Sequence, residues 1–222
     1  MSVQQDSKAK VAIIDYGSGN LASVSRALSA VGFSSLIVKR PSQIYDDHIL
    51  LLPGVSSFPF SMEKLRADDL NSAIISRAAS GQPLLGICAG MQLLFDQSTE
   101  FGICRGLSLI NGSVTALRSE VSDSFKIPNI GWRQLFIRND HSNQLSKYIS
   151  VSNYEFVYFA HSYFANPTLD EAIVATSLCD GFSVPSIASD KNIVGMQFHP
   201  EKSGSVGLDL LEKTLNYLQQ HF

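Results

Sequence analysis

Hydrophobic and polar residues alternate in blocks through the first half of the chain. Short apolar runs bounded by turn residues predict buried strands at 10–15, 34–38, 48–52 and 83–87. Apolar residues at helical spacing predict helices at 21–31 and 66–80. Strands that alternate with helices at this pitch are typical of a parallel sheet that is covered on both faces.

The second half has a different pattern, with short apolar segments separated by turn residues. These segments lie near 111–117, 133–138, 154–159, 172–178, 182–188 and 193–198. Turns between antiparallel strands are expected at 180–181 and 190–192, and a last helix at about 206–220. No linker or repeat divides the chain, so we expect one mixed α/β domain over 10–222, preceded by a flexible tail at 1–9.

Composition and charge narrow the classes of function. Apolar residues make up 45% of the 222 residues and charged residues 17%, so the chain can bury a sizeable core. The net charge of −3 offers no basic surface for nucleic acid. Cys88, Cys104 and Cys179 lie far apart, which fits neither a disulfide framework nor a zinc site and favours a reducing compartment. With no apolar leader or membrane-length segment, we expect a soluble cytoplasmic protein without a membrane partner.

One stretch, PLLGICAGMQLLF at 83–95, changes from a strand pattern to a helix pattern around a thiol. Gly86-x-Cys88-x-Gly90 between a strand and a helix has the layout of a nucleophile elbow, a sharp turn that exposes the nucleophile. The N-terminus of the following helix would favour a thiolate there. Alternatively, Cys88 is a small buried residue between two packing glycines. This stretch alone leaves both interpretations open.

A nucleophilic cysteine needs a base, and the base needs a group that orients it. Three histidines are interpreted as structural or solvated: His48, His141 and His221. His199 instead ends an apparent strand, which Pro200 stops. Glu201 lies two residues on, so in an extended segment its carboxylate can lie on the same side as the imidazole. Together with Cys88, these residues form a plausible Cys-His-Glu triad.

Several motifs together resemble a known family. GICAGMQLLF and GMQFHPEKS look like the motifs of class I (triad-type) glutamine amidotransferases. Within that class, IIDYGSGNLASV, LLPGVSSF, PNIGW and FAHSY are similar, in order, to the glutaminase subunit of imidazole glycerol phosphate synthase. The resemblance runs from about residue 10 to the end of the chain. It implies a single flavodoxin-like α/β domain, with a central, mostly parallel sheet and a smaller antiparallel sheet in the C-terminal half.

The resemblance implies glutamine hydrolysis. Cys88 would attack the side-chain carboxamide of glutamine, His199 would protonate the departing ammonia, and Glu201 would orient His199. Water would then hydrolyse the γ-glutamyl thioester to glutamate. An oxyanion hole is expected from the backbone of Gly54, Val55 and Ala89. The family's glutamine pocket corresponds to Gln92, Glu100, His161, Ser162 and Tyr163.

The same residues have plainer interpretations. Gln92 lies one helical turn after the cysteine, and without the resemblance it would be a partly exposed polar residue of a helix. Glu100 would be a solvated charge, and His161 a satisfied histidine in an aromatic strand.

The resemblance also implies a partner. The ammonia would pass to a (β/α)₈-barrel cyclase subunit, which makes imidazole glycerol phosphate and an aminoimidazole carboxamide ribotide in histidine biosynthesis. Asn20, Trp132 and Lys202 match family positions that face this subunit in the heterodimer. From the residues alone, a core position for Trp132 is favoured slightly over an interface anchor. No metal or organic cofactor is expected.

Some positions depart from the family pattern. Ser56 stands where the family commonly has a glycine, and the change could restrict the peptide that completes the oxyanion hole. Ala89 replaces a usual leucine and keeps its N–H. Asn129 and Arg133, which stand where His and Asn are more common, are expected on the partner face. Two alternatives therefore stay open: a divergent copy that supplies another ammonia acceptor, such as a surface-sugar amidotransferase, and a catalytically silent binding or regulatory subunit.

Overall fold

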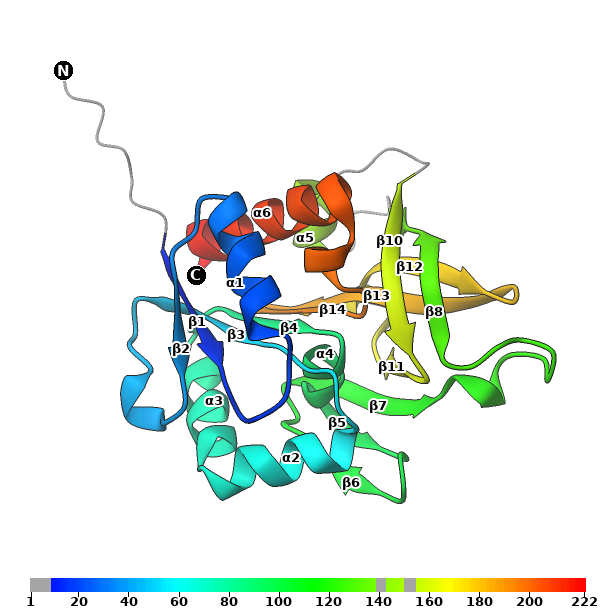
Figure 1. Cartoon of the computed structure of the whole chain (residues 1–222), viewed down its shortest axis with the longest axis horizontal. Coiled ribbons are helices and arrows are strands. Elements are labelled where there is room, and N and C mark those ends of the chain that lie inside the picture. The colour runs from blue at the N-terminus through cyan, green and yellow to red at the C-terminus, as the bar shows by residue number, and fades with distance from the viewer. Residues whose placement is uncertain (1–8, 139–142, 150–154) are drawn as a thin grey trace.

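The computed structural model describes residues 9–138, 143–149 and 155–222 (Figure 1). The tail predicted at 1–9 lies outside these ranges except for its last residue, and His141 lies outside them as well. Within the described ranges, no helix is long and apolar enough to cross a membrane.

A large mixed sheet forms the centre of the fold. Its strand order is β2-β1-β3-β4-β14-β13-β12-β9. The parallel part consists of β2 Ser35–Val38, β1 Lys10–Ile14, β3 His48–Leu52, β4 Leu84–Ile87 and β14 Ile193–Met196. The antiparallel part consists of β13 Phe182–Asp190, β12 Ile173–Cys179 and β9 Phe136–Ile137. The predicted parallel sheet is confirmed, and strands of the second half extend it.

Two smaller sheets stand beside the central one (Figure 1). One pairs β8 Asn129–Gln134 with β10 Phe156–His161 in antiparallel fashion. The other has the order β11-β7-β5-β6, from Tyr163–Pro167, Ile110–Ala116, Phe95–Ser98 and Cys104–Arg105. In it, β5 and β7 run parallel, and the other two pairings are antiparallel.

Helices cover both faces of the central sheet (Figure 1). On one face lie α1 Leu21–Ala30 and α6 Gly204–His221, whose apolar residues join one core cluster. On the other lie α2 Phe58–Ala67 and α3 Leu70–Ala79, which belong to a second cluster. The short helices are α4 Ala89–Leu93 and α5 Gln144–Tyr148. The apolar stripes that predicted the first and last helices are therefore the faces that these helices bury.

Two helix predictions need correction. The helix expected at 66–80 is two helices, α2 and α3, separated at Asp69, whose φ of 55° lies in the left-handed region. The sequence prediction missed the start of α2 at Phe58, because Pro59 reads as a helix breaker. Helices nevertheless tolerate proline in their first turn. The helical pattern after the thiol is also shorter than expected, because Phe95 already begins β5.

The parallel strands β3, β4 and β14 are neighbours, and their carboxyl ends meet at one edge of the sheet. The loop at 53–57 follows the first of these strands, Cys88 the second, and residues 197–199 the third. Open α/β sheets bind ligands at this edge. The topology thus brings three separate segments of chain to one place.

Candidate active site

Cys88 lies on a sharp turn between β4 and α4. Its backbone has φ 55° and ψ −113°, a strained conformation for a residue with a side chain. The Cys88 N–H donates to the carbonyl of Met196 on β14 (2.7 Å). A Cβ added at Gly86 would lie 2.7 Å from the carbonyl oxygen of Gly90, and one at Gly90 would collide with the carbonyl of Leu52. Both glycines are required by the close approach of backbone, as an elbow demands.

The sulfur faces a pocket although its residue is only 5% exposed. This cavity of about 330 Å³ lies between the 53–57 loop, the elbow and the β10–β11 bend. It brings together all the residues predicted for glutamine binding: Gln92, Glu100, His161, Ser162 and Tyr163. Val55, Ala89, His199 and Lys202 line it as well. A cysteine that served only to fill the core would not need this access. The elbow interpretation therefore fits the geometry better than the core interpretation.

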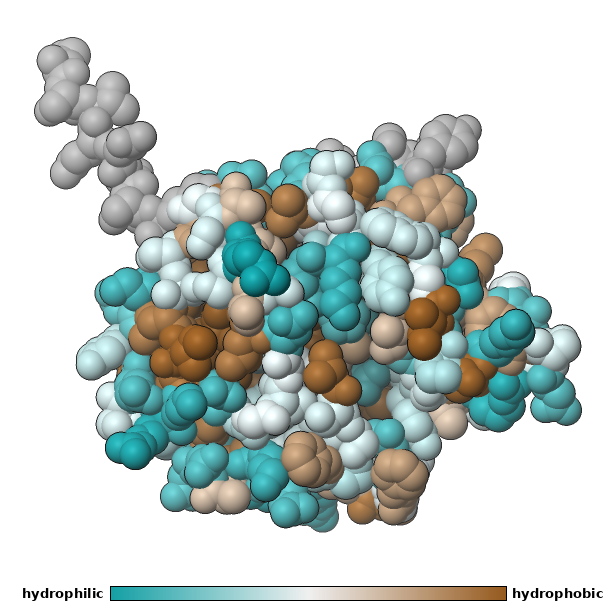
Figure 2. Space-filling view, viewed as in Figure 1, coloured by the Kyte–Doolittle hydropathy of each residue, from teal (hydrophilic) through white to brown (hydrophobic). Residues whose placement is uncertain are grey.

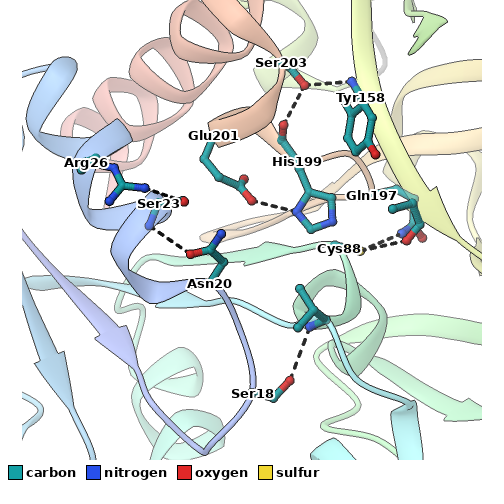
Figure 3. A network of polar contacts seen from close by, with 12 residues as sticks. Ser18, Asn20, Ser23, Arg26, Cys88, Tyr158, Gln197, His199, Glu201 and Ser203 are labelled. Carbon is teal, nitrogen blue, oxygen red and sulfur yellow. Dashed lines mark hydrogen bonds and ion pairs between the residues drawn. The ribbon is translucent and has the colours of Figure 1, made fainter. Parts of the chain in front are cut away.

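His199 and Glu201 form a buried pair beside the cysteine (Figure 3). Glu201 Oε1 lies 2.8 Å from His199 Nδ1, the ring nitrogen on the side away from Cys88. The prediction that Glu201 follows His199 in an extended segment is wrong, because Pro200–Lys202 is a 3₁₀ turn. Proline at the first position of the turn starts it, and the tight turn still carries the carboxylate back to the ring.

The charge of the imidazole depends on these neighbours. Burial lowers the pKa of His199, but hydrogen bonds with Cys88 and Glu201 more than offset it and raise that pKa to about 10. The backbone of His199 is also held, because its N–H donates to the Tyr158 carbonyl and its carbonyl accepts from the Ser203 hydroxyl (2.7 Å). An imidazolium fixed beside a sulfur favours the thiolate form of that sulfur.

Gln92 is buried on α4 and does not reach solvent as a surface residue would. Its Nε2 donates to the Tyr163 carbonyl (2.8 Å) and to Oε1 of Gln197 (3.0 Å). Glu100 is not a solvated charge either, since its Oε2 accepts from the N–H of Phe58 (2.7 Å), the first residue of α2. A carboxylate at a helix N-terminus is favourable there.

His161 is both a satisfied histidine and a lining residue of the pocket. Its Nδ1 lies 2.9 Å from the Tyr163 carbonyl, so this nitrogen carries the proton. Its Nε2 therefore accepts from Asn129 Nδ2 (2.9 Å). Burial lowers the pKa of His161 to about 4, more than the hydrogen bond to Tyr163 raises it. The ring is neutral at physiological pH.

Hydrogen bonds from the segment after β1 hold the loop that follows β3. The Tyr16 hydroxyl donates to the Pro53 carbonyl (2.7 Å), and burial raises the pKa of Tyr16 to about 12. The N–H of Val55 points to the Ser18 hydroxyl oxygen (3.4 Å), and the Ser18 hydroxyl donates to Ser56 (2.8 Å). In this arrangement the Val55 N–H is directed to Ser18 and not to the pocket.

Of the three residues predicted to face a partner, Lys202 lines the pocket, and Trp132 packs against Tyr158 beside Lys202. Asn20 caps α1 through Ser23 N–H (3.2 Å), and Lys202 lines the pocket with its Nζ 5.9 Å from the Tyr158 ring centre. Trp132 is 50% exposed, so the core position favoured from the sequence is wrong. Asn129 does not lie on this surface, because it is buried against His161. Figure 2 shows hydrophobic side chains emerging among polar ones on this face, over the β8 and β10 region.

Several residues of the site escaped sequence reasoning. Gln197, Ser18, Tyr16 and Ser203 hold other site residues in place through hydrogen bonds. A polar residue inside the apolar strand at 193–198 was the available signal for Gln197, since buried polar groups need partners. Among the described residues, no group of three or more His, Cys, Asp or Glu could hold a metal ion.

Chemically, the arrangement has the parts of a nucleophilic acyl-transfer site. A thiol on an elbow faces an imidazole, and a buried carboxylate orients that imidazole. The sequence itself matches a known family. The model of the family described as "Glutamine amidotransferase class-I" matches residues 12–216. The chain therefore belongs to the class I glutamine amidotransferase family.

Within this family, the curated relatives carry a more specific name. A Listeria innocua protein named "Imidazole glycerol phosphate synthase subunit HisH" is 42% identical over 204 residues, which cover 91% of this chain and 93% of the relative. The protein of that name from Bacillus velezensis is 39% identical over 203 residues (90% and 93%). A "HisH 1" from Legionella pneumophila is 40% identical over 210 residues (92% and 98%).

Solved structures share the fold at lower identity. A structure described as "Crystal structure of glutamine amidotransferase" matches with a TM-score of 0.72 at 16% identity, covering 95% of this chain and 98% of the other. PurLQS from Thermotoga maritima matches with a TM-score of 0.67 at 21% identity, covering 95% and 99%. These matches confirm the predicted fold class.

The low pKa of His161 predicts how stability responds to acid. The unfolded chain protonates this histidine near its ordinary pKa of 6.5, whereas the folded protein resists protonation down to about 4. The stabilisation is therefore present above pH 6.5 and is lost as the pH falls toward 4. Between about pH 7.5 and pH 5, the free energy of unfolding of the wild type should fall by roughly 2 kcal/mol more than that of His161→Gln.

Urea unfolding at the two pH values measures this difference. The exposed His221 at the end of α6 provides the matched control, and His221→Gln should keep the wild-type pH dependence. Equal pH dependence in the wild type and His161→Gln would contradict the prediction.

Proposed function

We propose that this chain is the glutaminase subunit of an imidazole glycerol phosphate synthase, and that it supplies ammonia from L-glutamine to a cyclase subunit. The observation that carries the proposal is the buried Glu201–His199 pair (2.8 Å) next to Cys88 on its strained elbow. Relatives that bear the subunit's name cover at least nine tenths of the chain, which supports the more specific assignment.

The first half-reaction forms a thioester. The Cys88 thiolate attacks the carboxamide carbon of glutamine, and the carbonyl oxygen becomes an oxyanion. His199 then gives its Nε2 proton to the nitrogen, the C–N bond breaks, and ammonia leaves. Glu201 keeps the ring oriented and stabilises its positive charge. The raised pKa of His199, about 10, is consistent with an imidazolium that is ready to act as an acid at neutral pH.

The second half-reaction releases glutamate. A water molecule gives a proton to the now neutral His199 and attacks the thioester carbon. The C–S bond breaks, and the sulfur leaves as a thiolate beside the restored imidazolium. The substrate is expected in the 330 Å³ pocket, in contact with Gln92, Glu100 and the 161–163 segment.

The oxyanion needs hydrogen-bond donors placed where its charge develops. The backbone N–H of Ala89 follows the nucleophile directly and is one proposed donor. The second is proposed in the Gly54-Val55 segment, and Gly54 packs so closely on the elbow that a Cβ there would lie 2.7 Å from that of Ala89. With the Val55 N–H directed to Ser18, this second donor becomes available only after the peptide turns.

Asn20, Trp132 and Lys202 are proposed to contact the cyclase subunit. Ile130 and Trp132 are both exposed and alternate along β8, so their side chains emerge on the same face of the strand. A half-exposed tryptophan next to a second apolar residue fits an interface anchor better than an isolated surface residue.

Loss of the thiol should abolish the reaction. Cys88→Ala removes the atom that forms the thioester, so glutamate release should fall by at least about a thousandfold, to the background of the assay. The midpoint of thermal unfolding should not fall, because alanine fills most of the space of the small side chain. Retained hydrolysis at the wild-type rate would refute the triad. A wild type that releases no glutamate, with or without a cyclase subunit, would instead favour a silent regulatory subunit.

Freeing the Val55 N–H should raise the activity of the isolated chain. Ser18→Ala removes the hydroxyl that accepts from Val55 and donates to Ser56, so the peptide can turn toward the substrate at lower cost. Loss of one such hydrogen bond predicts about a two- to fivefold increase in glutamate release without a partner. Ser25→Ala is the control, since the Ser25 hydroxyl pairs with Ser35 on β2. An unchanged or reduced rate in Ser18→Ala would argue against a restraint of the Val55 peptide by Ser18.

A cyclase subunit of the histidine pathway should bind at the mouth of the pocket. Its addition, with its nucleotide ligand, should stimulate glutamate release strongly, and Trp132→Ala should raise the dissociation constant by about tenfold or more. The control is Tyr45→Ala, which removes an exposed aromatic residue that precedes β3, at the opposite edge of the sheet. Activity without any response to the cyclase would point to a different ammonia acceptor.

A further inference from the structure

Gln197 lies between the sulfur of Cys88 and the side chain of Gln92. It follows β14 directly, is completely buried, and its N–H donates to the Ser186 carbonyl on β13 (2.9 Å). Its side chain points at the elbow (Figure 3), with Nε2 3.9 Å from the Cys88 sulfur. On its other side, Oε1 accepts from Gln92.

The hydrogen-bond chain determines which end of the Gln197 amide faces the sulfur. The Tyr163 carbonyl can only accept, so Gln92 must present its NH₂ group to it. The same NH₂ group lies against Gln197, which must therefore present its oxygen. The Gln197 NH₂ group is then directed to the Cys88 sulfur, and the opposite orientation would place two NH₂ groups against each other.

The sulfur thus has a separate partner for each of its protonation states. In the thiol form, the S–H can donate to the Ala160 carbonyl, 3.8 Å away. In the thiolate form that bond is lost, and the Gln197 N–H becomes a donor to an anion. Hydrogen bonds to ionised groups are shorter and stronger than neutral ones. The contact at 3.9 Å should therefore tighten when the sulfur ionises.

We propose that Gln197 is a positioning residue, which stabilises the Cys88 thiolate through its N–H and couples the sulfur to the glutamine pocket through Gln92. The inference deepens the proposed function and rests on it for the identity of the substrate. Other titratable groups also act on the sulfur: His199 directly, Glu201 through His199, and Tyr16 from the segment after β1. Gln197 differs from these groups because its side chain is neutral and contacts both the Cys88 sulfur and Gln92.

Alkylation of Cys88 by iodoacetamide tests the proposal without glutamine. The rate at Cys88 is followed by peptide mass spectrometry across pH, with the partly exposed Cys104 of the same protein as internal reference. In Gln197→Met, which removes the donor, the midpoint of the Cys88 profile should move upward by about one pH unit. In Gln197→Asn, a shorter polar side chain whose N–H recedes from the sulfur, it should move in the same direction.

A second buried glutamine provides the matched control. The Gln82 amide donates to the carbonyls of Tyr45 and His48 at the opposite edge of the sheet. Gln82→Met should therefore keep the wild-type Cys88 profile. An unshifted profile in folded Gln197→Met and Gln197→Asn would overturn the proposal, and so would an equal shift in Gln82→Met. If the wild type alkylates as expected but releases no glutamate, the proposed function fails and the role of Gln197 at the sulfur stands.

Discussion

The pairing of β14 with β4 is the contact on which the rest of the site depends. It places Met196 opposite Ile87 in parallel register, and the Cys88 N–H continues the ladder to the Met196 carbonyl. Gln197 and Cys88 lie 109 residues apart in the chain, yet this pairing makes them neighbours. Without it, the thiol would have neither His199 nor the Gln197 amide beside it. The proposed chemistry thus depends on sheet topology more than on any local motif.

Close backbone packing around the elbow turns this topology into a fixed geometry. Gly86 and Gly195 are paired in register, and the Met91 side chain fills the space that a Cβ at Gly195 would need. The helix α4 can therefore lie directly on the two strands. Because backbone packs closely on Gly86 and Gly90 at either side of the turn, the strained backbone of Cys88 is held by its surroundings. The sulfur consequently has little freedom to leave the pocket.

The sequence allowed correct prediction of the features that repeat or carry motifs. The parallel strands, the sharp turn at Cys88 and the proximity of His199 and Glu201 to that turn could be inferred, because apolar runs, glycine spacing and family motifs report on burial, turns and shared sites. Two predictions failed at prolines, whose local effect was misjudged. Pro59 lies in the first turn of α2, and Pro200 begins a 3₁₀ turn where an extended segment was expected. The exposure of Trp132 could not be known either, since an apolar residue in a strand has no local signal that separates a core face from an outer face.

The distance along the chain between the nucleophile and its base also has a consequence during synthesis. The strand that brings His199 is the last one of the described chain, and only the final helix α6 follows it. A growing chain that has already made the turn at Cys88 therefore has no histidine beside its thiol until synthesis has reached His199. Such long-range strand pairing is intrinsically slow, because loop-closure entropy opposes it. The thiol thus meets its proposed base only after β14 has paired with β4.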